Sequence, residues 1–181
     1  MNFDLQPMLE NELIKLVPLK EDDFESLFSI AADPLIWDQH PNKERYKREV
    51  FENFFQGAIA SNAAFIVYDQ KTGNVVGSSR YYELDEENST ITIGYTFIGR
   101  NYWGKGYNAA MKKLMLNHAF KFVNKVELHI GATNFRSQKA AEKLGAVKIG
   151  EQDITYFGEQ AKWNFIYQIN KDNWLNRESK L

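Results

Sequence analysis

A glycine-rich segment between a predicted strand and a predicted helix constrains the fold of this chain most strongly. The segment GRNYWGKGYNAAM spans residues 99–111. Before it, Thr and Ile alternate over residues 90–93, as in a half-buried strand. After it, apolar side chains recur at helical spacing from Ala110 to Phe122. A glycine-rich entry to a helix favours anion binding, because backbone N–H groups meet the positive end of the helix dipole there.

Three kinds of phosphate site fit parts of this segment. From Gly99 it reads G-x-x-x-x-G-K-G, but a P-loop needs Ser or Thr where Gly106 stands. From Gly104 it reads G-x-G-x-x-A, and Glu127 stands about where a dinucleotide fold places its ribose-binding acid. Against this reading, residues 100–103 separate the strand from the glycines, and the strand alternates unlike a fully buried parallel strand. A pyrophosphate cradle for coenzyme A requires only backbone N–H groups, small residues and a helix N-terminus, which the segment provides. The alternative is a glycine-rich start of a helix that binds no ligand.

The composition indicates one globular unit and excludes several classes of protein. The chain has 181 residues, 44% of them hydrophobic and 14% aromatic, which suits one domain with a sizeable core. Cysteine is absent, so disulfides, thiolate metal sites and cysteine nucleophiles are excluded. A net charge of −2 gives no attraction toward nucleic acid. Residues 1–16 have no signal-peptide pattern and no apolar run approaches roughly 18 residues, so we expect a cytoplasmic protein without a membrane partner.

Apolar spacing and turn residues predict the order of the elements. A helix should end near Asp33-Pro34, because the residue before proline avoids the α region. Residues 72–74, Thr-Gly-Asn, supply a hairpin turn, and Gly145 ends a later helix as its C′ residue. The second half reads strand, helix, strand, helix, which implies a βαβ crossover. Together these elements predict an α+β layered fold. Strands are expected at 12–19, 63–69, 75–84, 90–98, 125–132, 147–152 and 163–169, and helices at 20–33, 46–62, 106–122 and 134–144.

Two stretches of the chain resemble a known family. ITIGYTFIGRNYWGKGYNAAMKKLMLNHAF and VELHIGATNFRSQKAAEKLGAVKIGE resemble the GNAT N-acetyltransferase superfamily, in particular the branch of ribosomal-protein-alanine N-acetyltransferases. The likeness runs from about Leu13 to Trp174 and is densest over 91–151. It implies a single acetyltransferase domain over residues 1–181 with its core at about 13–174. It also implies a mixed, mostly antiparallel sheet flanked by helices, with a βαβα core that binds acetyl-CoA in a V-shaped gap between the fourth and fifth strands.

The resemblance also implies where acetyl-CoA binds. The family's pyrophosphate loop, Q/R-x-x-G-x-G/A, overlays Trp103, Gly106 and Asn108, so tryptophan replaces the polar first residue and asparagine the last small one. The fourth strand is expected to splay near Phe97-Ile98 and to point a backbone N–H at the thioester carbonyl, where it would stabilise the oxyanion. An ordinary strand end is the alternative there. The implied cofactor contacts are Phe97, Ile98, Trp103, Gly104, Lys105, Gly106, Tyr107, Asn108, Ala109 and Asn134.

Two residues match the family's catalytic positions after the fifth strand. Asn134 matches the asparagine that holds the pantetheine arm, and an N-cap role is compatible with this. Ser137 matches the hydroxyl that protonates the departing thiolate, with an ordinary first-turn serine as its alternative. A thiol with a pKa near 8.5 is a fairly good leaving group, so modest acid help suffices.

The general base is less clear from the sequence. Relatives often carry glutamate just before the IGY of the fourth strand, where this chain has Thr92. Glu83, His129 and Asp38 are the substitutes we consider, in that order. No metal site is expected, because His118 falls on an apolar helix face and His40 has no second ligand at metal-binding spacing. An acceptor pocket could be lined by aromatic side chains that are otherwise core residues: Trp37, Tyr81, Tyr82 and Tyr156.

The resemblance implies direct transfer of acetyl from acetyl-CoA to a primary amine in a ternary complex. The chain has no cysteine to carry an acyl group. The acceptor could be a protein N-terminus, a polyamine, an amino acid or an aminoglycoside-like compound, and a homodimer is left open. Two alternatives remain: a noncatalytic acyl-CoA sensor, consistent with Thr92, and a nicotinamide-binding module.

Overall fold

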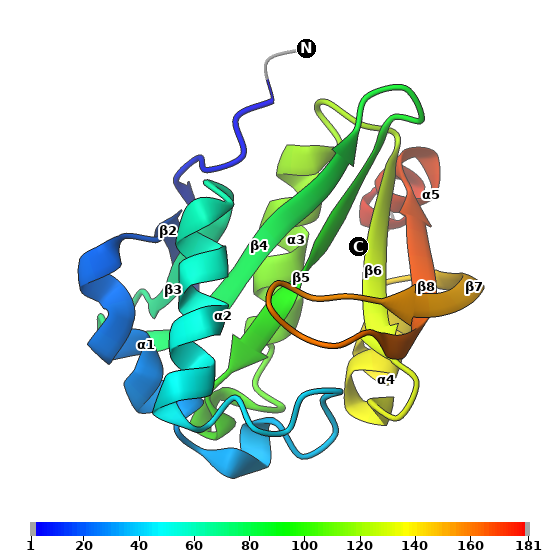
Figure 1. Cartoon of the computed structure of the whole chain (residues 1–181). Helices are drawn as coiled ribbons and strands as arrows, with labels where there is room; N and C mark the ends of the chain where they lie inside the picture. Colours follow the sequence, from blue (N-terminus) through cyan, green and yellow to red (C-terminus); the bar gives the residue numbers. More distant parts are fainter. Residues whose placement is uncertain (1–2, 180–181) are drawn as a thin grey trace.

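One mixed sheet forms the centre of the computed structural model, which describes residues 3–179 (Figure 1). Its eight strands lie in the order β1-β2-β3-β4-β5-β6-β8-β7. β5 and β6 are parallel, and every other neighbouring pair is antiparallel, which confirms the expected α+β class. The strands are β1 (Leu9–Glu10), β2 (Ile14–Pro18), β3 (Ala64–Asp69), β4 (Val75–Asp85), β5 (Thr90–Ile98), β6 (Lys125–Gly131), β7 (Val147–Ile154) and β8 (Lys162–Asn170).

Helices cover both faces of the sheet. α1 and α2 lie on one face, and α3 lies on the other (Figure 1). The predicted helices are present with shorter bounds, and Gly145, at φ +88°, follows α4 as expected. None of the helices in residues 3–179 has the length and apolar content of a membrane span. The helices are α1 (Phe24–Ala31), α2 (Arg48–Ala60), α3 (Tyr107–Ala119), α4 (Phe135–Lys143) and α5 (Lys171–Glu178), with short 3₁₀ turns at Glu21–Asp23, Pro34–Ile36 and Arg100–Tyr102.

Two large apolar cores lie one on each face of the sheet, and a third, small cluster consists of Ile154, Tyr156 and Ile166. Along β3, Phe65 and Val67 join the core under α3, whereas Ala64 and Ile66 join the core under α1 and α2. Because successive side chains of a strand point to opposite faces, the two cores lie on opposite sides. Burial of a large apolar side chain contributes roughly 1.5–3 kcal/mol, so the cores hold both helix layers on the sheet.

A bulge in β5 changes which face its side chains reach. Ile91 and Ile93 belong to the core under α3, but Phe97 belongs to the core under α2. Strict alternation would place all three on one face. The register with β4 shifts between Ser78 and Arg80, and Tyr95 has φ +52°, so the extra residue lies next to Gly94. The bulge therefore turns the end of β5 relative to its beginning.

The parallel strands β5 and β6 separate, as expected, but earlier than predicted. Their pairing runs only from Thr90–Lys125 to Thr92–Glu127, although β5 continues to Ile98 and β6 to Gly131. The sequence placed the splay near Phe97-Ile98. The last pair, at Thr92, comes just before the bulge at Tyr95. A bulge increases the twist of its strand, which explains why β5 turns away from β6 here.

Three features of the fold were not predicted. β1 and α5 are short and have weak local patterns, and β8 inserts between β6 and β7 while pairing antiparallel with both. Trp174 anchors α5: its side chain is buried, and its indole Nε1–H donates to Asn117 Oδ1 at 2.7 Å. α5 thus packs against the end of α3.

Candidate active site

A cavity of about 810 Å³ lies where β5 and β6 separate. This volume is within the range of small-molecule sites. Its lining includes the start of α3 and the first turns of α4, together with aromatic side chains from the α1 and α2 face. Of the cofactor contacts predicted from the sequence, all except Lys105 line this cavity; Lys105 is exposed on the loop.

The loop before α3 forms an open backbone cradle. Gly104 has φ +70° and Gly106 has φ +83°, a region that glycine adopts without strain. No heavy atom lies within 4 Å of the place where a Cβ would stand at either residue. Gly106 is the N-cap of α3, so unpaired first-turn N–H groups begin here. Open space, small residues and a helix N-terminus fit the expected pyrophosphate.

Trp103 explains how the loop departs from the family pattern. Its indole Nε1–H donates to Ile98 O at 2.9 Å, which ties the loop to the end of β5. The guanidinium of Arg136, from α4, lies 4.0 Å from the centre of the Trp103 ring. Trp103 therefore connects the loop to both β5 and α4. The family pattern has a polar residue at this position.

Asn134 and Ser137 lie together at the start of α4. Asn134 Oδ1 accepts the backbone N–H of Ser137 at 3.2 Å, so the N-cap interpretation is confirmed. Within residues 3–179, no hydrogen-bond partner is found for the Ser137 hydroxyl or the Asn134 Nδ2 group. Both side chains line the cavity, and their remaining donors are available to a ligand.

His129 is the candidate base that the structure brings to the cavity. Its buried ring lies between the Tyr82 hydroxyl, 3.2 Å from Nδ1, and Glu127 Oε2, 3.2 Å from Nε2. Glu83, ranked first from the sequence, is outside the cavity lining, and its side chain is 60% exposed. Its Oε2 lies 3.8 Å from His129 Nδ1. Asp38 also lies outside the lining and pairs with Arg136 Nη2 at 3.3 Å.

The aromatic residues divide between the cavity and the core. Trp37 and Tyr156 line the cavity, and Tyr82 contacts His129. The prediction for Tyr81 was wrong: it is fully buried under α3, and its hydroxyl donates to Met115 O at 2.6 Å. Tyr81 and Tyr82 point to opposite faces of β4, as neighbours in a strand must.

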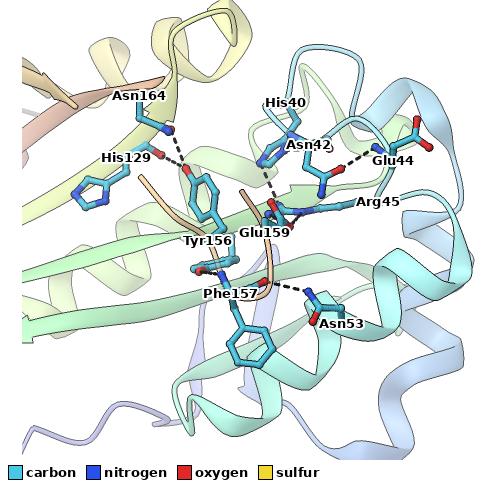
Figure 2. A network of polar contacts seen from close by, with 11 residues as sticks. His40, Asn42, Glu44, Arg45, Asn53, His129, Tyr156, Phe157, Glu159 and Asn164 are labelled. Carbon is cyan, nitrogen blue, oxygen red and sulfur yellow. Dashed lines mark hydrogen bonds and ion pairs between the residues drawn. The ribbon is translucent and has the colours of Figure 1, made fainter. Parts of the chain in front are cut away.

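A buried polar network holds the loop between β7 and β8 over α2 (Figure 2). Arg45 Nε donates to Glu159 Oε1 at 2.8 Å, and the two side chains are 1% and 8% exposed. Arg45 Nη1 lies 3.1 Å from His40 Nε2. Burial and then Arg45 hold the pKa of His40 well below its usual range, so His40 accepts as a neutral ring. In the same loop, Tyr156 Oη donates to Asn164 Oδ1 at 2.8 Å.

Lys112 is a buried lysine of α3 that the sequence analysis missed. It lines the cavity, and Nζ donates to Thr96 Oγ1 at 2.6 Å. Ser79 Oγ lies 3.5 Å from Nζ. Burial lowers the pKa of Lys112 to about 7. The helical spacing held a signal, because Lys112 precedes the buried Met115 and Leu116 by three and four residues.

The remaining histidine is structural. His118 is buried under α3, and Nε2 lies 2.7 Å from Asp4 O, away from the cavity. Among the described residues, no group of three His, Cys, Asp or Glu side chains could hold a metal ion.

The sheet, the separating parallel pair and the glycine-started helix together define an acetyltransferase architecture. The chain belongs to the GNAT family, since residues 14–147 match the family model of the acetyltransferase (GNAT) domain. These residues hold the cradle, β5, β6 and α4.

Individual relatives agree with this assignment. An uncharacterized N-acetyltransferase p20 from Bacillus licheniformis is 30% identical over 88 residues, which are 48% of this chain and 49% of that protein. The chain thus matches about half the length of this curated relative. A GCN5-related N-acetyltransferase from Brucella melitensis has a TM-score of 0.80 at 19% identity, covering 94% of this chain and 81% of that one.

A third relative was solved with ligands. A spermidine N-acetyltransferase from Vibrio cholerae, in complex with CoA and spermine, has a TM-score of 0.70 at 19% identity, covering 92% of this chain and 100% of that one. At this identity the likeness concerns the fold. The resemblance to the ribosomal-protein-alanine branch stays a prediction.

Proposed function

We propose that the chain transfers acetyl from acetyl-CoA to a primary amine by direct attack, with both substrates held in the cavity between β5 and β6. When bound, acetyl-CoA supplies the acetyl group as an activated thioester. The observation that supports this most strongly is that residues from both faces of the sheet line one cavity, with Ser137 on the α3 and α4 side and His129 on the other. In a direct transfer the amine attacks the carbonyl carbon from which the thiol departs, so the cavity has to hold both groups at that carbon.

On the α3 side, the chain's own groups suit coenzyme A. Backbone N–H groups from Gly104 to the first turn of α3 would hold the pyrophosphate. The Asn134 Nδ2 donor would hold the pantetheine arm. Phe97 and Ile98, at the end of β5, would direct a backbone N–H at the thioester carbonyl.

On the opposite side, His129 would take the proton from the attacking amine, directly or through water. Glu127 and Glu83 lie near its two nitrogens, at 3.2 and 3.8 Å, and the contact with Glu127 orients the ring. Glu83 then acts through His129 instead of meeting the amine itself. This role replaces the glutamate that relatives carry at Thr92, a residue that is 2% exposed here.

Ser137 would direct its hydroxyl at the sulfur and hold the leaving group by a hydrogen bond. The hydroxyl lines the cavity and has no partner within the described residues, so its hydrogen is available. Its place on the N-capped first turn of α4 fixes its position.

A panel of amines tests the proposal. Purified protein with acetyl-CoA is offered peptides with free N-termini, polyamines, amino acids and aminoglycosides, and release of free CoA is followed. We expect amine-dependent release with one class of acceptor. CoA binding without release for any amine would favour the noncatalytic acyl-CoA sensor, which Thr92 in place of glutamate supports.

A further inference from the structure

Lys112 carries a charge into the cavity without an acid to balance it. Its side chain is 7% exposed, and its two polar neighbours, Thr96 and Ser79, are hydroxyls. No carboxylate of the described residues contributes to its pKa, which burial alone lowers. An ammonium buried without a counter-ion is costly, so an anion beside Nζ would stabilise the protonated form.

The position of Lys112 indicates which anion would meet it. Lys112 lies on α3, whose core also includes Ala141 of α4, so it shares a face of the sheet with the helix of Ser137. His129 alternates with Leu128 and Ile130, which pack under α3, and therefore faces the opposite side. In the proposed reaction the thiol leaves on the α3 side and the amine enters on the His129 side.

We propose that Lys112 is the proton donor to the departing thiolate; this inference rests on the proposed acetyl transfer. As the nitrogen–carbon bond forms, the carbon–sulfur bond breaks and its electron pair stays on sulfur. The proton on Lys112 Nζ moves to that sulfur and leaves a neutral amine, which solvent reprotonates. The proton of the acceptor amine goes to His129.

The acidities of the groups agree with this assignment. A donor with a pKa of about 7 gives its proton readily to a thiolate whose thiol has a pKa near 8.5, if CoA resembles cysteine. A serine hydroxyl is a much weaker acid, so Ser137 can orient the sulfur by a hydrogen bond while Lys112 supplies the proton. Tyr107 is unsuited, because its hydroxyl donates to Asp69 and this raises its pKa to about 12.

Two substitutions separate proton donation from charge and from packing. Lys112→Met removes the charge and fills the same buried space, and the Ser79 and Thr96 hydroxyls still bond each other at 2.8 Å. Lys112→Arg keeps the charge but holds its proton too tightly to release it. We expect both variants to lower kcat about 10² to 10⁴-fold, with CoA affinity retained. Lys121→Met, at an exposed lysine just after α3, is the control.

A spectroscopic readout tests the contact without turnover. The ultraviolet absorbance of the thiolate of bound CoA is titrated against pH. Among the described residues, Nζ bonds the Ser79 and Thr96 hydroxyls, which stay neutral over this range. The charged or titratable groups that line the cavity from β6 and α4, namely His129, Arg136, Lys139 and Lys143, are the same in both proteins, so the comparison isolates Lys112. With Lys112 beside the sulfur, the two groups titrate as a coupled pair, so ionisation of the bound thiol should begin at lower pH in the native protein than in Lys112→Met.

Stability distinguishes this role from a structural one. The native state binds the Lys112 proton more weakly than the unfolded chain, so this residue costs most stability below about pH 7 and none above its unfolded pKa of 10.5. Lys112→Met should therefore be at least as stable as the native protein near neutral pH, and this advantage should shrink as pH rises. A destabilised Lys112→Met that also loses CoA affinity would overturn the proposal in favour of a packing role.

The remaining outcomes are equally decisive. If Lys112→Arg were active, the residue would act only as a fixed charge. If the thiol titration were the same in Lys112→Met, Nζ would lie away from the sulfur. Either result overturns the proposal for Lys112 but leaves the proposed acetyl transfer standing. Absence of CoA binding to the native protein would overturn both.

Discussion

At the scale of residues, two titratable side chains define the cavity chemically, and the sheet keeps them apart. His129 has carboxylates near both ring nitrogens, whereas Lys112 has hydroxyls alone. Burial without an acid lowers the pKa of Lys112 to about 7, so its ammonium releases a proton more readily than an exposed lysine does. One group is therefore suited to take a proton and the other to give one. This pairing of environments is what acid–base catalysis requires.

His129→Gln should lower kcat/KM about 10² to 10⁴-fold, because it removes the proton acceptor. Glu83→Gln should cost less than about tenfold, since its exposed carboxylate lies 3.8 Å from the ring and acts from a distance. Steady-state kinetics over a range of pH measures both. His118→Gln, at a buried histidine away from the cavity, is the matched control and should alter stability alone. If Glu83→Gln lost as much activity as His129→Gln, the glutamate would be the base, as the sequence ranking had it.

At the scale of elements, the loop of residues 155–161 closes the His129 side of the cavity against α2. The buried pair of Arg45 and Glu159 holds it, and Asn53 Nδ2 of α2 donates to Phe157 O at 3.0 Å. Arg80 stacks on Tyr95, 3.4 Å from its centre, and burial lowers its pKa to about 10. Glu159 is the acid that pairs with the buried Arg45, whereas Arg80 has no paired acid among the described residues.

Glu159→Gln should therefore release the loop. It leaves the Arg45 charge buried without its acid, which costs about 3–5 kcal/mol in comparable pairs. We expect faster limited proteolysis within residues 155–161 and a raised KM for the acceptor amine, with CoA affinity little changed. The double variant Arg45→Met with Glu159→Met removes both charges and should recover much of the stability. Native protease resistance in the single variant would show that the ion pair does not hold the loop.

The sequence predicted elements better than their arrangement. The phenylalanine stripe of α2, the hairpin turn at Gly73 and the Asn134 cap are local patterns, and each is present. The insertion of β8 between β6 and β7 has no local pattern, because strand order depends on contacts between distant residues. For the same reason the pair of Arg45 and Glu159, 114 residues apart, could not be found.

The candidate site was predictable where it follows a motif. The cradle residues and Ser137 lie at the cavity because glycine spacing and capping fix a loop and a helix start. Glu83 was ranked above His129 because the sequence does not show which strands flank β6. The neighbouring strands decide that His129 is buried at the cavity. Lys112 was missed because a lysine in a helix is expected in solvent, and only the packing of α3 against β5 buries it.

At the scale of the whole molecule, one irregularity in the sheet creates the site. The bulge at Tyr95 and the end of pairing after Thr92 open β5 from β6 without unfolding either strand. The two cores remain separate on their faces, and residues from both faces line the gap between them. The cradle at Gly104 and Gly106 lies at one end of this gap. We propose that CoA binds along this gap.

Thermal unfolding with added CoA tests that claim most directly. A ligand bound only by the native state stabilises it, by about 2.7 kcal/mol at a hundredfold excess over Kd. Gly106→Asp should abolish this shift, because it places a carboxylate where the pyrophosphate would lie. Gly73→Asp is the matched control: it has the same positive φ and the same open space, but it lies in the hairpin between β3 and β4. We expect a CoA-dependent rise in Tm for the native protein and for Gly73→Asp, and none for Gly106→Asp. A rise with NAD or with ATP and magnesium but not with CoA would contradict the proposal.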